Sequence, residues 1–309
     1  MAKCLVCYLD DLSDGHHYHQ HCALKIFGLK NAPELNYNLA EMKELGKKIV
    51  RSQGIMTGVQ PKISLALERT ERQQGRLTLR MGEFILKPPT QYNAQMPETE
   101  DLTMHLASIC KIKTVPHALI PLASGELSYI TRRIDRAENK KIHMEDFCQL
   151  AELLTEDKYK SSMEKVGKLV GQLSSLPGLD LVNLFELTLF NYVTGNNDMH
   201  LKNFSLIETP MGWQLSAAYD LLNVNLVNTN DNEETALTIN GKKRKLRKAD
   251  FLQLALSYKL NDAQTKNSFQ NILSREQEMI DFIKISFLDD DYKTRYIAML
   301  KDRCEILRD

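Results

Sequence analysis

The chain has 309 residues, enough for one large domain or two modest ones with a substantial core. Its 40 basic residues balance 40 acidic ones, which excludes a general electrostatic attraction to nucleic acid or to a membrane surface. No apolar run approaches the roughly 20 residues that cross a bilayer, and the N-terminal residues lack the apolar stretch of a signal peptide. We therefore expect a cytoplasmic protein.

The first half of the chain is predicted to be rich in strands. Alternating apolar and polar side chains predict five strands, at residues 62–68, 76–80, 83–87, 117–123 and 127–134. Turn residues between the first three strands indicate an antiparallel meander. Prolines end the third strand, and a helix is expected between Glu98 and about Cys110.

The second half is predicted to be mostly helical. Helices are expected at residues 143–154, 161–174, 181–194 and 249–258, and in pieces over 276–308. The third of these is apolar almost all round, which is typical of a central buried helix. Strands followed by helices indicate an α+β chain of two lobes, with the boundary just after residue 134.

The most informative segment runs from residue 195 to residue 223. A buried helix is expected to end at Gly195, and two alternating runs that flank a turn near residues 210–211 predict a hairpin. In that hairpin position 203 lies across from about position 218. Asn203 and Asp220 should then lie at the same end of the ladder, with Asp198 just before it.

Two carboxylates and a carboxamide gathered in this way suit phosphoryl transfer. Magnesium accepts such oxygen ligands when nucleotide phosphates complete its coordination, and a second carboxylate can accept the proton of a substrate hydroxyl. The spacing from Asp198 to Asn203 is that of the protein-kinase catalytic loop. The alternative is ordinary loop chemistry, because Asn and Asp favour turns in any protein.

A nucleotide also needs a cation and a backbone cradle at its phosphates. Lys87 ends a predicted strand, and Glu100, or else Glu98, on the next helix is expected to pair with it. The cradle is predicted in the segment 57–62, with candidate residues Thr57, Gly58, Val59, Gln60 and Lys62. Its single glycine departs from the three-glycine loop of standard protein kinases.

Six segments in the right order carry a family resemblance. They are GVQPKISL (58–65), FILKP (84–88), RRIDR (132–136), HMEDFCQL (143–150), GNNDMHLKNFSL (195–206) and AYDLLN (218–223). They resemble the signatures of the HipA/HipT family of bacterial serine/threonine kinases, the toxins of toxin–antitoxin modules. The chain looks most similar to the short HipT type, which lacks an extra N-terminal subdomain.

The resemblance implies a two-lobed protein-kinase-like fold with a β-rich N-lobe and a largely helical C-lobe. It implies transfer of the γ-phosphate of ATP, with Mg²⁺, to a serine or threonine of a protein such as an aminoacyl-tRNA synthetase. It also implies a cognate antitoxin as partner, with nucleic acid contacted at most through that antitoxin.

The resemblance also assigns residues. Asp198 matches the catalytic aspartate, Asn203 and Asp220 match the magnesium ligands, and Lys87 matches the lysine that contacts the ATP phosphates. The expected hinge beside the adenine comprises Tyr129, Ile130, Thr131, Arg132 and Arg133, followed by Asp135. In the catalytic loop, His200 is either a positioning residue or a structural histidine that hydrogen-bonds the backbone. Lys202 either contacts the γ-phosphate or is exposed to solvent.

Control by autophosphorylation in the glycine loop is a further implication of the resemblance. Thr57 is the hydroxyl residue just before the loop glycine, and Ser52 is the second candidate. A phosphate dianion at this place would repel the γ-phosphate of ATP. The hypothesis is that Thr57 is a self-inhibitory site.

The first 30 residues form a possible zinc arm that precedes lobes at 31–134 and 135–309. Cys4-x2-Cys7 and His19-x2-Cys22 have the spacing of tetrahedral zinc ligands. Three more histidines, at positions 16, 17 and 21, compete for the histidine role, and the alternative is free thiols in a mobile arm. The remaining cysteines, Cys110, Cys148 and Cys304, are expected to be buried in apolar surroundings.

The sequence also allows two alternative functions and two interpretations of its basic run. A small-molecule kinase of the aminoglycoside or choline phosphotransferase type shares a His…Asp-x4-Asn loop, whereas here the histidine follows Asp198. A pseudokinase that serves only as a binding module is the non-enzymatic alternative. The basic run 241–248 is either a contact for nucleic acid or an acidic partner, or a solvated loop before a helix near Ala249.

Overall fold

The computed structural model divides into two compact units. Unit 1 comprises residues 1–101, 115–133 and 285–288, and unit 2 comprises residues 102–114, 134–284 and 289–309. The structure describes the chain except at residues 1–2, 11, 13–14, 53–59, 70–74, 91–92, 138–139 and 229–230, and except for the side chains of residues 49–52. In the described chain, no helix is long and apolar enough to span a membrane.

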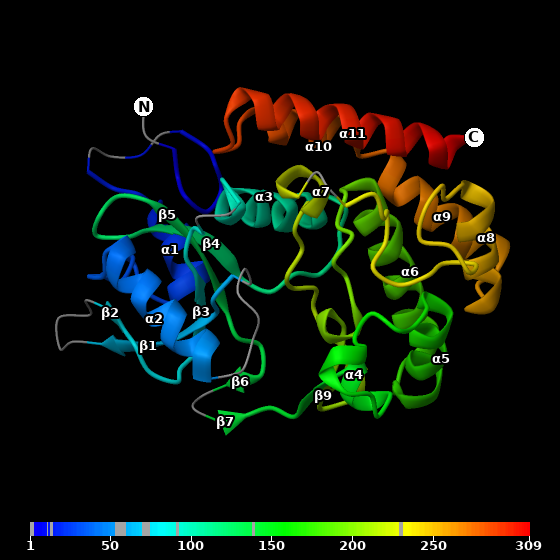
Figure 1. Cartoon of the computed structure of the whole chain (residues 1–309), viewed down its shortest axis with the longest axis horizontal. Coiled ribbons are helices and arrows are strands. Elements are labelled where there is room, and N and C mark those ends of the chain that lie inside the picture. The colour runs from blue at the N-terminus through cyan, green and yellow to red at the C-terminus, as the bar shows by residue number, and fades with distance from the viewer. Residues whose placement is uncertain are drawn as a thin grey trace. The chain divides into compact units, whose positions relative to one another are not determined.

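Unit 1 is built on an antiparallel sheet (Figure 1). Its strands are β1 (Ile63–Arg69), β2 (Gly75–Thr78), β3 (Phe84–Lys87), β4 (His117–Pro121) and β5 (Leu127–Arg132), in the spatial order β2-β1-β3-β5-β4. All five lie within a residue or two of the predicted strands. The alternation of apolar side chains gives each strand one face for the core, where Leu65, Leu77 and Leu86 are fully buried.

The predicted meander is wrong, because β3 pairs with β1 and not with β2 in the described residues. The cause lies in the segment between β2 and β3. The Gly82 backbone N–H donates to Ser64 Oγ, and a side chain at Gly82 would collide with the backbone of Leu65 and Ala66 in β1. The chain therefore returns directly onto β1 after β2, which the turn residues alone do not reveal.

Two helices cover this sheet, and a third begins in unit 1. Helix α1 (Gln20–Phe27) buries Ala23, Ile26 and Phe27 in the same core as the strands, and α2 (Leu39–Ser52) contributes Met42. Helix α3 (Met96–Ile109) starts in unit 1 and continues in unit 2 after Asp101. Its predicted range of 98–110 agrees with these bounds.

Unit 2 is mostly helical. Its helices are α4 (Phe147–Leu150), α5 (Met163–Leu173), α6 (Pro177–Val193), α7 (Val224–Val227), α8 (Lys248–Ser257), α9 (Asp262–Leu273), α10 (Glu276–Lys284) and α11 (Asp290–Arg308), with 3₁₀ turns at Thr155–Asp157 and Leu201–Asn203. Helix α6 packs against α5, α8, α9 and α11, which confirms its prediction as a central helix (Figure 1). Helix α9 was not foreseen.

Short strands complete unit 2. A pair of two-residue strands, β6 (Arg136–Ala137) and β7 (Lys140–Lys141), precedes a three-stranded sheet in the order β10-β9-β8. Its strands are β8 (Met144–Asp146), β9 (Ser205–Thr209) and β10 (Gly212–Leu215). The fold is therefore α+β with a β-rich unit and a largely helical unit, as predicted.

The helix predicted over 143–154 is largely wrong. Residues 144–146 pair with β9, and only Phe147–Leu150 is helical. The helix cannot begin earlier because Asp146 caps it: the Asp146 carboxylate accepts from the Gln149 N–H while the Gln149 side chain accepts from the Asp146 N–H. The basic run 241–248 does precede a helix, and Lys242 and Lys243 form ion pairs with Asp250 and Glu233.

Candidate active site

In unit 1 a buried ion pair joins Lys87 and Glu100. Lys87 is the last residue of β3 and is 4% exposed, and its Nζ lies 2.5 Å from Glu100 Oε1 on α3. The ammonium also lies 5.4 Å from the centre of the Tyr129 ring on β5. A lysine is rarely buried unless it is paired, so the pairing and the ring hold this cation at the end of the strand.

Glu100, and not Glu98, is the partner of Lys87. Both carboxyls lie at the start of α3, but Glu98 makes no ion pair in the described residues. Burial raises the pKa of Glu98 to about 7, with a smaller contribution from the charge of Asp101. Of the two predicted partners for Lys87, Glu100 is therefore the one that the structure confirms.

The predicted phosphate cradle is only partly described. Thr57, Gly58 and Val59 lie outside the described residues, and so does the Ser52 side chain. Gln60, within the predicted cradle, donates from Nε2 to the carbonyl of Pro88 at 3.0 Å. Because Pro88 directly follows Lys87, this bond ties Gln60 to the residue just after the strand that carries the lysine. Lys62 immediately precedes β1.

The predicted hinge forms the end of β5 and the residue beyond it. Tyr129, Ile130 and Thr131 pair with both β3 and β4, so their backbone is used in the sheet. The Arg132 N–H donates to Pro116, and the Arg133 N–H donates to Glu83 at 2.7 Å. The chain re-enters unit 2 at Ile134, and the Asp135 carboxylate accepts from Arg136 at 2.7 Å. The adenine contacts assigned to this segment stay a prediction.

In unit 2 the segment predicted to be the catalytic loop, called the catalytic loop below, begins where α6 ends. Gly195 has φ +74°, and a side chain there would lie 2.7 Å from Asn223 Oδ1 and from Met299 Sδ. Only glycine fits this left-handed position at a helix C-terminus. The Asn196 N–H closes the turn by donating to the Asn191 carbonyl, and the Asn196 side chain accepts from the N–H of Asp198.

The β9–β10 hairpin brings Asn203 to the same end as the segment that holds Asp220. Its register pairs Thr209 with Gly212 and Leu206 with Leu215, and continued by three residues it places position 203 opposite 218. The predicted register is therefore confirmed. Asn203 Nδ2 donates to the Asp198 carbonyl at 2.9 Å, which leaves its Oδ1 as the atom suited to a metal.

Tyr219 fixes the segment around Asp220 to the catalytic loop. Its hydroxyl lies 2.5 Å from Ser205 Oγ and donates to the Lys202 carbonyl at 3.2 Å. Burial raises the pKa of Tyr219, so the phenol stays protonated and can donate. Asp220 itself has φ +56°, a left-handed conformation that Asp tolerates better than most residues. A non-glycine residue in this conformation often marks a functional position.

Asp198 is engaged by a residue that the sequence did not single out. Tyr159 Oη donates to Asp198 Oδ1 at 2.5 Å, and the Tyr159 ring packs edge-on against His200 with ring centres 5.0 Å apart. Burial and the charge of Asp198 raise the pKa of Tyr159. Tyr159 precedes the loop by about forty positions and has no spacing motif, so no signal in the sequence could have found it.

Lys202 forms an ion pair with Asp146 at 2.9 Å. The lysine is therefore neither simply solvated nor committed to a phosphate, and Asp146 is the capping residue of α4. His200 is buried, and its backbone accepts from the Asn203 N–H. The structural role expected of this histidine is consistent with that bond, and its catalytic role stays a prediction.

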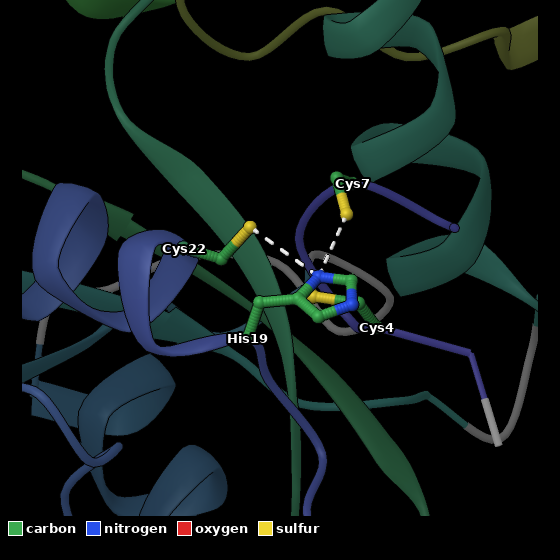
Figure 2. Close-up of side chains that lie close together, drawn as sticks. All are labelled: Cys4, Cys7, His19 and Cys22. Carbon is green, nitrogen blue, oxygen red and sulfur yellow. Dashed lines mark hydrogen bonds between the residues drawn. The ribbon is translucent and has the colours of Figure 1, made fainter. Parts of the chain in front are cut away.

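The predicted zinc ligands Cys4, Cys7, His19 and Cys22 lie together in unit 1 (Figure 2). In sequence they precede the catalytic loop by more than 170 residues. The other cysteines, Cys110, Cys148 and Cys304, are buried free thiols, as expected.

A comparison with known protein families covers the predicted site residues in both units. The family model described as the HipA-like C-terminal domain matches residues 54–280. The chain belongs to this family. The match includes Lys87, Asp198, Asn203 and Asp220, so the resemblance seen in the sequence motifs is confirmed.

Curated relatives of the chain carry kinase names. "Putative kinase Y4mE" and "Putative kinase Y4dM" of Sinorhizobium fredii are each 32% identical to the chain over 54% of its length. A "Putative kinase" of Haemophilus influenzae is 26% identical over 62%. The matched regions cover 41%, 44% and 59% of these relatives, so the chain corresponds to about half of their length.

Solved structures share the fold. A chain from the complex of the Shewanella oneidensis toxin–antitoxin proteins HipA and HipB with operator DNA matches 95% of this chain and 79% of its own length. The TM-score is 0.69 at 18% identity. The Helicobacter pylori proinflammatory kinase CtkA matches 80% of this chain and 96% of its own length, with a TM-score of 0.55 at 14% identity. The kinase-like fold predicted from the sequence is therefore confirmed.

Proposed function

We propose that the chain transfers the γ-phosphate of ATP to a serine or threonine hydroxyl of a protein. The observation that carries the proposal is the buried ion pair between Lys87 and Glu100. A strand-end lysine paired with a glutamate of the following helix is the arrangement by which protein kinases hold the nucleotide phosphates. A lysine is costly to bury, so a surface role would not explain this placement.

Unit 2 carries the groups that the chemistry needs. Asp198 has a carboxylate to accept the proton of the substrate hydroxyl, provided that Tyr159 releases Oδ1. Asn203 and Asp220 supply an amide oxygen and a carboxylate, a donor set that fits Mg²⁺. When bound, that ion neutralises charge on the phosphates of the nucleotide. Lys87 supplies a further positive charge for those phosphates.

Lys202 and His200 have supporting roles in this proposal. Lys202 already has an anionic partner in Asp146, and it could contact the γ-phosphate only by leaving that partner. His200 packs on Tyr159 and so sets the position of the phenol that donates to Asp198. The expected nucleotide contacts of Thr57–Lys62, of the hinge residues 129–133 and of Asp135 belong to the same proposal.

The proposal extends to the class of substrate and partner. The family resemblance favours a translation component, such as an aminoacyl-tRNA synthetase, as the phosphorylated protein. One structural neighbour comes from a complex of HipA and HipB with operator DNA, which supports a cognate antitoxin as partner. Such a protein would contact nucleic acid only through the antitoxin.

Autophosphorylation at Thr57, with Ser52 as the second site, is proposed as the control of this activity. The supporting observation is that Gln60, three residues later, is tied to Pro88 beside Lys87. A phosphate dianion on Thr57 would repel the γ-phosphate of ATP, if the loop covers the nucleotide as the family resemblance implies. Phosphopeptide mapping after incubation with ATP should find Thr57 modified, and a map that shows neither residue modified would refute this control.

The central test is a radiolabelled ATP assay on cell lysate with wild-type protein and Asp198→Ala. We expect protein bands labelled only by the wild type, and loss of autophosphorylation in the variant. Asp290→Ala is a matched control, because Asp290 is a fully exposed aspartate at the start of α11, and it should label like the wild type. A labelled metabolite would point to a small-molecule kinase, and no wild-type-specific label would point to a pseudokinase.

A further inference from the structure

Four candidate metal ligands converge in the N-terminal part of unit 1. The sulfur atoms of Cys4, Cys7 and Cys22 and a ring nitrogen of His19 all lie within 4.8 Å of one another. Figure 2 shows the His19 imidazole between the three sulfur atoms. Cys7 Sγ lies 3.3 Å and Cys22 Sγ lies 4.0 Å from His19 Nδ1. None of the three cysteines forms a disulfide.

These separations fit the edges of one coordination tetrahedron. Zinc–sulfur bonds of about 2.3 Å and zinc–nitrogen bonds of about 2.0–2.1 Å give ligand–ligand edges of roughly 3.5–3.8 Å. The distances from Cys7 Sγ and Cys22 Sγ to His19 Nδ1, 3.3 Å and 4.0 Å, lie on either side of that range. We propose that Cys4, Cys7, His19 and Cys22 bind one structural Zn²⁺ ion.

The chemistry of the donor set selects the metal and its role. Three thiolates and one imidazole are soft to borderline ligands, which favour zinc over magnesium or calcium. Binding releases the protons of the three thiols, and the protein then fills all four positions of the ion. No position is left for water or substrate, so the ion is structural and takes no part in catalysis.

Backbone hydrogen bonds fix the segment that carries the first ligand pair, Cys4 and Cys7. The Cys4 N–H donates to Leu9, and the Tyr8 N–H donates to the Cys4 carbonyl, which closes the Cys4–Cys7 segment into a tight turn. Leu5 accepts from Leu119 of β4 and donates to His17, which joins this turn to the strand and to the second ligand pair. The ligand positions are therefore built into the fold of unit 1.

The second ligand pair is set by helix α1. His19 is the residue before the helix, and Cys22 lies in its first turn and is 3% exposed. The Ala23 N–H donates to the His19 carbonyl, which fixes His19 against the helix. His21 also lies 3.3 Å from Cys22 Sγ through Nε2, but it is exposed and is not one of the four ligand atoms that converge.

A chain of contacts leads from this cluster to the buried lysine. Tyr8, next to Cys7, is held at φ +64°, and its hydroxyl donates to Asp101 Oδ2 at 2.7 Å. Asp101 Oδ1 also lies 2.6 Å from His117 Nδ1. Asp101 is the neighbour of Glu100 on α3. The turn at Cys4–Cys7 therefore braces, through Tyr8, the helix that carries the ion-pair partner of Lys87. This positioning role of Tyr8 rests on the proposed kinase function, whereas the metal site does not.

Metal analysis of the full chain tests the site. Protein purified without a histidine tag and dialysed against metal-free buffer should retain one zinc ion per chain. His19→Ala should lose most of it, whereas the matched variant His21→Ala should keep it, as should Cys148→Ser outside the cluster. His19→Cys should also retain zinc, because it restores a fourth ligand.

Cobalt substitution gives a readout that does not depend on a variant folding. The Co²⁺-loaded wild type should show the thiolate charge-transfer bands and intense d–d bands of a tetrahedral site. Wild-type protein without stoichiometric zinc, or a cobalt spectrum of an octahedral oxygen site, would overturn the proposal. So would zinc loss in His21→Ala with retention in His19→Ala.

Tyr8→Phe tests the brace separately. This variant keeps all four ligands and should retain zinc, but it lacks the hydroxyl that bonds Asp101. We expect ATP binding to weaken by about threefold to tenfold, because Tyr8 acts on the nucleotide only through α3 and only part of the lost hydrogen bond to Asp101 is felt there. Retained zinc with unchanged ATP affinity would refute the brace and leave the metal site standing. No ATP binding even in the wild type would instead count against the proposed kinase function.

Discussion

At the level of single residues, the bond between Tyr159 and Asp198 is the contact that most affects the proposed chemistry. The phenol donates to Oδ1 at 2.5 Å, and a substrate hydroxyl would have to donate to the same carboxylate. The two donors therefore compete for Asp198. Because the phenol packs on His200, its hydroxyl can be removed while the ring contact is retained.

Tyr159→Phe should raise the rate of phosphoryl transfer. We expect an increase of about twofold to tenfold, since a hydrogen bond to a charged group contributes about 1.5–3 kcal/mol and only part of it must be broken during turnover. The measurement is the initial rate of autophosphorylation at saturating ATP. Tyr292→Phe on α11 is the control and should leave the rate unchanged. A fall of more than tenfold in Tyr159→Phe would show that the phenol positions Asp198 for catalysis.

Glu98 makes the stability of the protein depend on pH. Burial raises its pKa from 4.5 to about 7 in the folded state, so the folded chain holds a proton that the unfolded chain has released between these values. Stability from this group is therefore full below pH 4.5 and is lost as the pH rises through 7. Glu98→Gln should stabilise the protein by up to about 3 kcal/mol at pH 8.

The measurement is urea unfolding of both proteins at pH 5 and pH 8. At pH 5 the folded wild type already carries the proton, so most of the advantage of Glu98→Gln should disappear. Glu126→Gln serves as the control, because Glu126 is exposed and its carboxyl pKa is lowered by a hydrogen bond from Ser124. An equal gain at both pH values would rule out protonation of Glu98 as the cause.

At the level of elements, the end of α6 decides where the catalytic loop begins. Gly195 takes a left-handed conformation, and its carbonyl accepts from the backbone N–H groups of Val224 and Asn225 at the start of α7. The same glycine lies against Asn223, whose side chain caps α7. One small residue therefore sets both the helix end before Asp198 and the helix start after Asp220.

Gly195→Ala should destabilise the protein by about 2–4 kcal/mol, the sum of left-handed strain and overpacking. Gly241→Ala is a close match, because Gly241 has φ +76° and no atom within 4 Å of the added carbon. It should lose only about 1 kcal/mol from the conformation itself. Thermal and urea unfolding of the two variants measure the difference. Equal losses would mean that the contacts with Asn223 and Met299 relax without cost.

These elements also show what the sequence could and could not predict. The β9–β10 register followed from local turn residues, because a hairpin fixes its own pairing. The β1–β3 pairing and the strand at Met144–Asp146 depend on distant partners, β1 and β9, which local pattern does not specify. Within the site, the pairing of Lys87 with Glu100 could be predicted, because Lys87 ends a predicted strand and Glu100 lies in the helix that follows it. Tyr159 contacts Asp198 only through tertiary packing, so no sequence motif could predict their hydrogen bond.

At the scale of the whole molecule, each unit carries residues to which the proposed function assigns a nucleotide or metal role. Unit 1 holds Lys87 with Glu100, and unit 2 holds Asn203 with Asp220. A ligand that binds only the folded chain stabilises it by RT ln(1 + [L]/Kd), which is about 2.7 kcal/mol at a hundredfold excess over Kd. Nucleotide binding can therefore be measured by unfolding, without knowledge of the phosphorylated protein.

ATP with Mg²⁺ should raise the melting temperature of the wild type by roughly 5–10 °C at that excess, and ATP with a chelator should raise it less. Lys87→Met and Asp220→Asn change different units, and both should lose most of the shift if one nucleotide is held by both sets of residues. Asp198→Ala should keep the shift while losing phosphoryl transfer, because its carboxylate acts on the acceptor hydroxyl. If Asp220→Asn kept the full magnesium-dependent shift, the assignment of Asp220 as a metal ligand would be wrong.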